Sequence, residues 1–179
     1  MKRIESERIY FRELQPADAG GNYLEWMNNP EIVQYTESRF GSVSKNDLVK
    51  YIEERNKDKA TPFFAIVDKK SERHIGNIKI GPISVIHRYG DIGIIIGEKD
   101  FWGKGYATEA IKLLVEYSFK TYNLNKITAG CYENNLGSIK AFQKAGFEIE
   151  YRQKKQVFFE GKFIDAVKLC IFNPIDRPQ

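Results

Sequence analysis

The stretch Trp102-Gly103-Lys104-Gly105-Tyr106-Ala107 decides the fold. It follows the apolar residues 89–97, which predict a strand, and leads into residues 106–122, whose apolar side chains recur at helical spacing. A glycine-rich turn between a strand and a helix leaves several backbone N–H groups pointing at one spot, where the helix dipole adds to them. Such a turn binds phosphate, because glycine lets an anion approach the backbone. A turn that merely connects two elements is the alternative, and this stretch alone does not separate the two.

Two other glycine-rich phosphate motifs do not fit. The P-loop pattern GxxxxGK[ST] occurs nowhere in the chain, and Thr108 stands where the third glycine of the dinucleotide fingerprint GxGxxG would be. We therefore expect an anion other than a nucleoside triphosphate or NAD.

The rest of the chain alternates between strand and helix patterns. Short β-rich runs predict strands at residues 9–12, 63–68, 74–80, 89–97, 126–132, 146–152, 156–159 and 163–172. Helical spacing predicts helices at residues 16–27, 45–56, 106–122 and 138–145, the second of them opened by a capping pair, Ser44 and Asp47. Hairpins at both ends and a βαβα unit in the second half indicate a mixed α/β fold.

A second motif lies in the next βα unit. Asn134-Asn135-Leu136-Gly137-Ser138 ends the strand at 126–132 and opens the helix at 138–145, which Lys144-Ala145-Gly146-Phe147 closes. Gly105 and Asn135 thus belong to successive βα units and are expected at adjacent edges of one groove.

These two motifs resemble those of the GNAT N-acetyltransferases, and within them the ribosomal-protein N-acetyltransferase (RimJ/RimL-like) type. The family's phosphate motif is [QR]xxGx[GA], and residues 102–107 match it except at Trp102, the first position. The later motif NxxSxxxxxKxGF is matched at every defined position by Asn135, Ser138, Lys144, Gly146 and Phe147. The resemblance covers residues 9–172, and the two motifs occur in the family's order.

The resemblance implies a central mixed, mostly antiparallel, twisted sheet with splayed central strands, flanked by helices. It further implies acetyl-CoA as co-substrate, with its pantetheine arm between those strands and its pyrophosphate on the glycine-rich turn. The implied contacts are Ile94, Ile95 and Ile96 along the arm, Gly103, Lys104, Gly105, Tyr106 and Ala107 at the pyrophosphate, and Asn135 near the second strand.

The family chemistry is direct attack of an amine on the thioester. A backbone N–H near Ile96 is the candidate oxyanion donor. The tyrosine that often protonates the leaving thiolate in this superfamily is replaced here by Phe142, so Ser138, offered for that role in the RimJ/RimL-like branch, is the candidate acid. Asp91 is the candidate base. A helix first-turn serine and a solvent-facing strand aspartate are the structural alternatives for these two residues.

The sequence offers no evident strong base, which favours an acceptor whose amine loses its proton easily. A lysine-like amine needs roughly 4–5 kcal/mol to lose its proton at pH 7, whereas an α-amine needs only about 1 kcal/mol. The predicted acceptor is a small molecule such as an amino sugar, rather than a polyamine. The N-terminal half supports this, because residues 23–31 and 74–78 resemble acetyltransferases of nucleotide-linked amino sugars. Trp26, Tyr35 and Arg39 are candidate pocket residues, although the helical spacing of Trp26 with Tyr23 favours a core position for Trp26.

Two further interpretations stay open. One is a protein N-terminal acetyltransferase, whose acceptor is a peptide N-terminus. The other is a non-catalytic acetyl-CoA-binding module, which stays open because Phe142 stands in place of the usual tyrosine acid.

Composition bounds the remaining expectations. The 179 residues are 42% hydrophobic with a net charge of +4, and show no linker or repeat, so we expect a single domain over residues 1–179. No basic stripe indicates nucleic acid, and no apolar run or signal peptide indicates a membrane, which favours a cytoplasmic protein. Cys131 and Cys170 lack metal-ligand spacing, so no metal is expected. Relatives often form dimers, and the sequence leaves open whether this chain is a homodimer.

Overall fold

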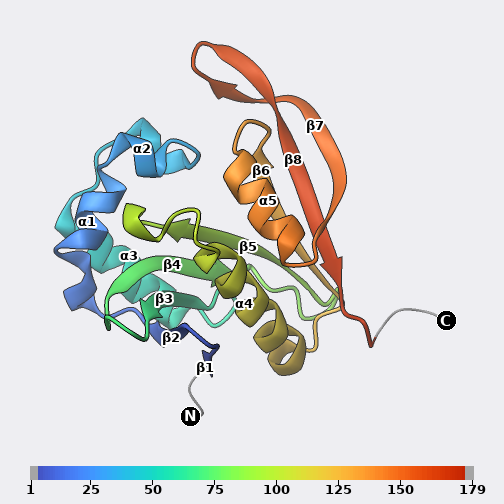
Figure 1. Ribbon diagram of the computed structural model, residues 1–179, viewed down its shortest axis with the longest axis horizontal. Coiled ribbons are helices and arrows are strands. Elements are labelled where there is room, and N and C mark those ends of the chain that lie inside the picture. The colour runs from blue at the N-terminus through green and yellow to red at the C-terminus, as the bar shows by residue number, and fades with distance from the viewer. Residues whose placement is uncertain (1–3, 176–179) are drawn as a thin grey trace.

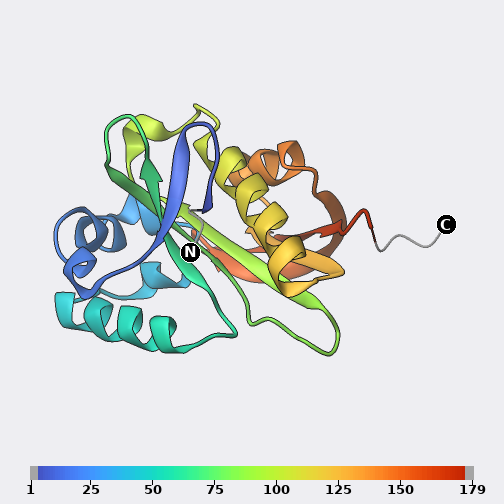
Figure 2. The same cartoon turned by 90° about the horizontal axis from the view of Figure 1, so that it is seen from below.

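The computed structural model describes residues 4–175 and contains one eight-stranded sheet with helices on both faces (Figures 1 and 2). The strand order is β1-β2-β3-β4-β5-β6-β8-β7, and every neighbouring pair is antiparallel except β5 and β6. The strands are β1 (Ile4–Glu5), β2 (Ile9–Glu13), β3 (Phe63–Asp68), β4 (His74–Ile80), β5 (Tyr89–Ile96), β6 (Lys126–Tyr132), β7 (Glu148–Phe159) and β8 (Lys162–Phe172). The predicted mixed, mostly antiparallel sheet is confirmed. The single domain expected over residues 1–179 includes residues 1–3 and 176–179, which lie outside the described range.

Two hydrophobic clusters occupy opposite faces of the sheet. Because strand residues alternate between faces, Phe64 and Ile66 of β3 join one cluster while Phe63 and Ala65 join the other. We call the first face the back face, where α4 (Tyr106–Tyr122) and α5 (Leu136–Lys144) pack, and the second the front face. The N-terminal elements belong to the front: η1 (Pro16–Ala19), α1 (Asn22–Met27), α2 (Pro30–Val33), η2 (Glu37–Phe40) and α3 (Lys45–Lys57); η3 (Lys99–Phe101) precedes α4.

The parallel strands β5 and β6 separate before they end. Their register runs from Tyr89 opposite Lys126 to Ile92 opposite Ala129, yet β5 continues to Ile96 and β6 to Tyr132. We call this separated region, residues 93–96 of β5 and 130–132 of β6, the fork. It is the predicted splay of the central strands.

Two sequence expectations were wrong in detail. The helix expected at residues 16–27 is two pieces, because Gly20 ends η1 and Gly21, with φ of +57°, is the N-cap of α1. The separate strands expected at 146–152 and 156–159 form the single strand β7. The polar residues between them are accommodated by a shift in the β7–β8 register between Gln153 and Val157. The β7–β8 hairpin consequently extends beyond the body of the sheet (Figure 1).

Candidate active site

Backbone groups of β5 line one edge of the fork. The Gly97 N–H donates to Ile75 O at 3.0 Å, and Asp91 O accepts from Gly81 N–H at 2.9 Å. Odd-numbered residues of β5 therefore direct their backbone groups at β4, and even-numbered ones direct theirs at the fork. Of the three predicted arm contacts, Ile94 and Ile96 present backbone groups to the fork, whereas Ile95 pairs with Asn77 of β4.

The glycine-rich turn lies between the end of β5 and the start of α4. Gly103 and Gly105 have φ of +71° and +84°, a left-handed conformation that a side chain would strain, and Gly105 is the N-cap of α4. Among the described residues, the backbone N–H groups from 104 to 107 have no hydrogen-bond acceptor. The turn thus provides free donors at the positive end of a 17-residue helix, which suits a pyrophosphate.

Arg8 holds this turn in place, a role that sequence reasoning missed. Its Nη1 donates to Lys104 O at 3.0 Å, its Nε donates to a Glu109 carboxylate oxygen at 2.6 Å, and its guanidinium lies 4.3 Å from the Tyr106 ring centroid. Although burial acts to raise it, bonds from Arg8 and Ser6 hold the pKa of Glu109 below its ordinary value. No local pattern predicts this contact, because it joins residues about a hundred positions apart.

The second motif forms the N-terminus of α5. The Asn135 side chain accepts from Ser138 N–H at 3.2 Å and caps the helix. Ser138 Oγ lies 3.3 Å from Cys131 Sγ on β6, next to the fork. Burial raises the pKa of the Cys131 thiol, so it stays protonated at neutral pH and is a poor nucleophile. Ser138 therefore offers a protic oxygen on this side of the fork.

Phe142 belongs to the hydrophobic core. It is 2% exposed and packs edge-on against Phe147, with ring centroids 5.1 Å apart. The residue at the superfamily's tyrosine position thus contributes packing between α5 and the sheet.

Asp91 lies on the front face, one residue before the last β5–β6 pair. Its carboxylate accepts from the Thr128 hydroxyl at 2.7 Å, directly across in the register. Burial raises the pKa of Asp91, while Thr128 and the charges of Lys168 and Lys79 act against that rise. A buried carboxylate is a stronger base than an exposed one. Asp91 is half-buried, so it is neither a fully exposed strand residue nor a fully buried one.

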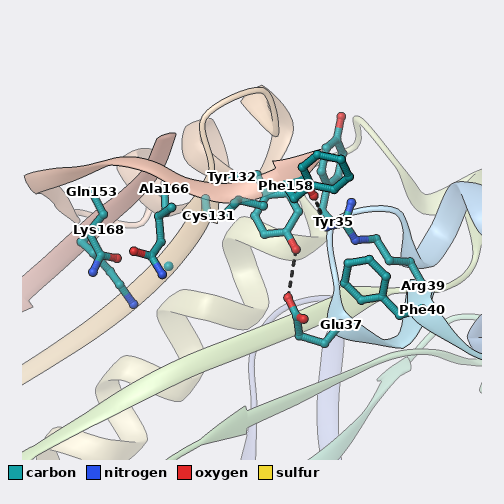
Figure 3. A pocket seen from close by; sticks show the side chains of 13 residues that line it. Tyr35, Glu37, Arg39, Phe40, Cys131, Tyr132, Gln153, Phe158, Ala166 and Lys168 are labelled. Carbon is teal, nitrogen blue, oxygen red and sulfur yellow. Dashed lines mark hydrogen bonds between the residues drawn. The ribbon is translucent and has the colours of Figure 1, made fainter. Parts of the chain in front are cut away.

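A front-face cavity of about 500 Å³ borders the β6 edge of the fork (Figure 3). Tyr35, Glu37 and Arg39 line it from around η2, and the Tyr132 hydroxyl donates to Glu37 at 3.0 Å. The Arg39 guanidinium lies over the rings of Phe40, Tyr132 and Phe159. Two predicted pocket residues, Tyr35 and Arg39, are therefore brought to one cavity.

Trp26 has a different place. It is buried in the front cluster, its ring lies against the Gly97 backbone, and its Nε1 donates to Glu98 at 3.0 Å. Gly97 is required here, because a Cβ would come within 1.9 Å of the indole. Trp26 therefore fixes the end of β5 rather than lining the cavity.

Residues 4–175 contain neither a cluster of three or more His, Cys, Asp or Glu side chains that could hold a metal ion nor a helix with the length and hydropathy of a membrane span.

Comparison with known proteins matches this geometry to one family. Residues 8–148 match the acetyltransferase (GNAT) domain. The chain is 30% identical over 180 residues to the uncharacterized N-acetyltransferase p20 of Bacillus licheniformis, covering 97% of each. Spermidine N-acetyltransferase of Vibrio cholerae, solved with CoA and spermine, superposes with a TM-score of 0.82 at 26% identity, covering 92% of this chain and 95% of that one. Ribosomal-protein-S5-alanine acetyltransferase of Vibrio fischeri shares the fold, with a TM-score of 0.80 at 22% identity and coverage of 98% and 99%.

One family accounts for the fork, for the free amides at the start of α4 and for these similarities. The chain belongs to the GNAT family and is an acetyl-CoA-dependent N-acetyltransferase that acts on amines.

Proposed function

We propose that the chain transfers the acetyl group of acetyl-CoA to the primary amine of a small molecule, by direct attack within a ternary complex. The observation that carries this proposal is the position of the fork: the glycine-rich turn lies at its β5 end, and the front-face cavity borders its β6 edge. Acetyl-CoA supplies an activated thioester, and the acceptor amine approaches it from the cavity.

The proposed binding residues follow from the backbone. The amides of Gly103, Lys104, Gly105, Tyr106 and Ala107 hold the pyrophosphate, and the Lys104 side chain adds charge from an exposed position. Ile94 and Ile96 bind the pantetheine arm through groups facing the fork, while Ile95 holds β5 against β4. Asn135 keeps the start of α5 beside the arm through its cap to Ser138.

Three groups carry the proposed chemistry. The Ile96 N–H points into the fork, where it stabilises the oxyanion that forms as the amine attacks. Asp91 receives the proton of the attacking amine, and burial favours its basicity. Ser138 donates a proton to the leaving thiolate, since Phe142 has none to give.

The cavity supports an acceptor with a ring, such as an amino sugar. Aromatic side chains surround it, and their faces pack well against the apolar faces of sugar and base rings. These side chains are Tyr35, Phe40, Tyr132 and Phe158. A peptide N-terminus is the alternative acceptor from the same chemistry.

A polyamine is the second candidate, favoured by the Vibrio cholerae spermidine N-acetyltransferase that superposes on most of the chain. Thiol release from acetyl-CoA, measured against amino sugars, nucleotide-linked amino sugars, peptides and spermidine, tests these choices together. We expect the highest kcat/KM with an amino sugar. Spermidine as by far the best substrate would refute that preference, and no release with any amine would refute transfer to these acceptor classes.

A further inference from the structure

One rung of side-chain positions crosses four strands of the front face at the start of the fork. Lys79 of β4 is the register partner of Gly93 of β5, and Gly130 of β6 is the partner of Lys168 of β8. Gly93 and Gly130 directly follow the last β5–β6 pair, so they face each other across the opening fork. Cross-strand partners share a face, so both lysines lie on the cavity side of the sheet.

The two glycines let both lysines lie inward along the sheet. A Cβ on Gly93 would come within 3.1 Å of Lys79 Cε, and a Cβ on Gly130 would come within 3.0 Å of Lys168 Nζ. A side chain at either position would make the lysine beside it shift by a few tenths of an ångström. The two lysine side chains therefore lie over the fork glycines from its two sides, Lys168 with its Nζ nearest Gly130 and Lys79 with its Cε nearest Gly93. Lys168 also lines the cavity (Figure 3).

The charge around this rung is unbalanced. Among the described residues neither Lys79 nor Lys168 forms an ion pair. Asp91, one rung below, is the carboxylate that both lysines act on electrostatically, and it bonds to Thr128 instead. Two cations thus share one carboxylate, in a half-buried setting where charge interactions are stronger than in water.

We propose that Lys168 and Lys79 form a binding site for an anionic group, a carboxylate or a phosphate, on the acceptor amine. This inference rests on the proposed transfer to a small-molecule amine and specifies its acceptor class. An anion here completes the charge balance of the rung and holds the amine at the fork, where Asp91 can take its proton. The same two cations repel spermidine, which carries several positive charges and no anion.

The test compares three amines with one ring and different substituents at one carbon: glucosamine, glucosamine 6-phosphate and glucosaminuronic acid. We expect the wild-type enzyme to prefer one or both anionic amines by about tenfold or more in kcat/KM. The phosphate and the carboxylate arms identify which anion the site takes. Inorganic phosphate serves as a second probe, and it should compete with the amine and leave the KM for acetyl-CoA unchanged.

Substitutions at the two lysines show whether the preference for anionic amines depends on them. Lys168→Gln and Lys79→Gln should each lower the ratio of kcat/KM for the preferred anionic amine to that for glucosamine about tenfold, mainly through the KM of the anionic amine. The ratio cancels any change in the basicity of Asp91, on which both lysines act. Lys168→Arg should retain the preference. Lys162→Gln is the matched control, because Lys162 is an exposed lysine at the other end of the same strand. Thermal unfolding of each variant shows whether it is folded.

The outcomes separate this inference from the proposed function. Two results would overturn the anion site while leaving acetyl transfer in place. One is an equal loss of kcat/KM with charged and neutral amines in the Lys→Gln variants, and the other is a wild-type enzyme that shows no preference for anionic amines. Absence of thiol release with every amine, spermidine included, removes the proposed function itself.

Discussion

The indole Nε1 of Trp102 donates a hydrogen bond to the carbonyl oxygen of Ile96 at 2.7 Å. This bond joins the first residue of the phosphate-motif stretch to the last residue of β5, where the proposed oxyanion donor lies. Trp102 stands where the family motif has Gln or Arg, so the departure from that motif has a structural role: it ties the glycine-rich turn to the fork.

Replacing Trp102 with Phe tests that role. The aromatic ring stays and the hydrogen bond is lost, so the glycine-rich turn is no longer tied to the end of β5. We expect the KM for acetyl-CoA to rise about tenfold, equivalent to about 1.4 kcal/mol. Because Trp102 is 39% exposed, thermal stability should change little. Phe163→Leu, at the exposed hairpin end, is the control and should leave the KM unchanged; equal KM in both variants would contradict the role.

Arg8 should matter for acetyl-CoA binding more than for folding. Arg8→Ala removes the donor to Lys104 O and the partner of Glu109, so the glycine-rich turn loses its support from the segment between β1 and β2. We expect about a tenfold higher KM for acetyl-CoA. Glu109→Gln should act in the same direction, and the double variant should lose less than the sum, because both changes remove one contact. Arg12→Ala is the control: it breaks the ion pair with Asp18, away from the turn, and should affect stability alone.

The parts of the fold set by local sequence were predictable. The helix at 106–122 and the strands at 63–68, 74–80 and 126–132 match the structure residue for residue, since apolar periodicity and glycine punctuation determine each of them. The capping pair of Ser44 and Asp47 also opens α3 as expected. The break at Gly21 and the bulge in β7 were missed, because both depend on packing with distant segments.

The site was predictable where backbone supplies the chemistry. The glycine-rich turn and the fork edge are backbone features at the ends of strands and helices, and sequence patterns locate those ends. The contacts of Arg8 and the lysine rung over Gly93 and Gly130 join distant residues, and only sheet register shows them. Trp26 was a candidate for the pocket, yet its helical spacing with Tyr23 already favoured the core position that it has.

Asp91 gives a prediction in which activity and stability move in opposite directions. Burial raises the pKa of Asp91, so its ionised form destabilises the native state, and this loss appears as pH rises through the native pKa. Asp91→Asn should therefore raise Tm at pH 7. The gain should shrink as pH falls and vanish below about 3.9, the ordinary pKa of an aspartate, where Asp91 becomes protonated in both states.

The same variant tests catalysis. Asp91→Asn should lower kcat/KM about a hundredfold and remove the acidic limb of its pH profile. A higher Tm with an unchanged pH profile would show that Asp91 is buried without acting as the base.

Ser138 should affect the chemical step alone. Ser138→Ala removes the proposed acid, and we expect kcat to fall about a hundredfold while the KM for acetyl-CoA stays close to wild type. Cys131→Ala is the matched control, because it removes the neighbouring thiol and leaves the hydroxyl. If both variants keep wild-type kcat, the thiolate leaves without a proton from α5.

Phe142→Tyr decides whether the superfamily's tyrosine could work at this position. Phe142 is 2% exposed and packs against Phe147, so an added hydroxyl enters the core and loses its hydration. We expect unfolding free energy to fall by about 1–3 kcal/mol without any gain in kcat. Chemical denaturation and steady-state kinetics measure the two quantities on one preparation. An increase in kcat at unchanged stability would instead mean that the ring edge faces the thioester, and that Ser138 substitutes for a tyrosine that the site still accommodates.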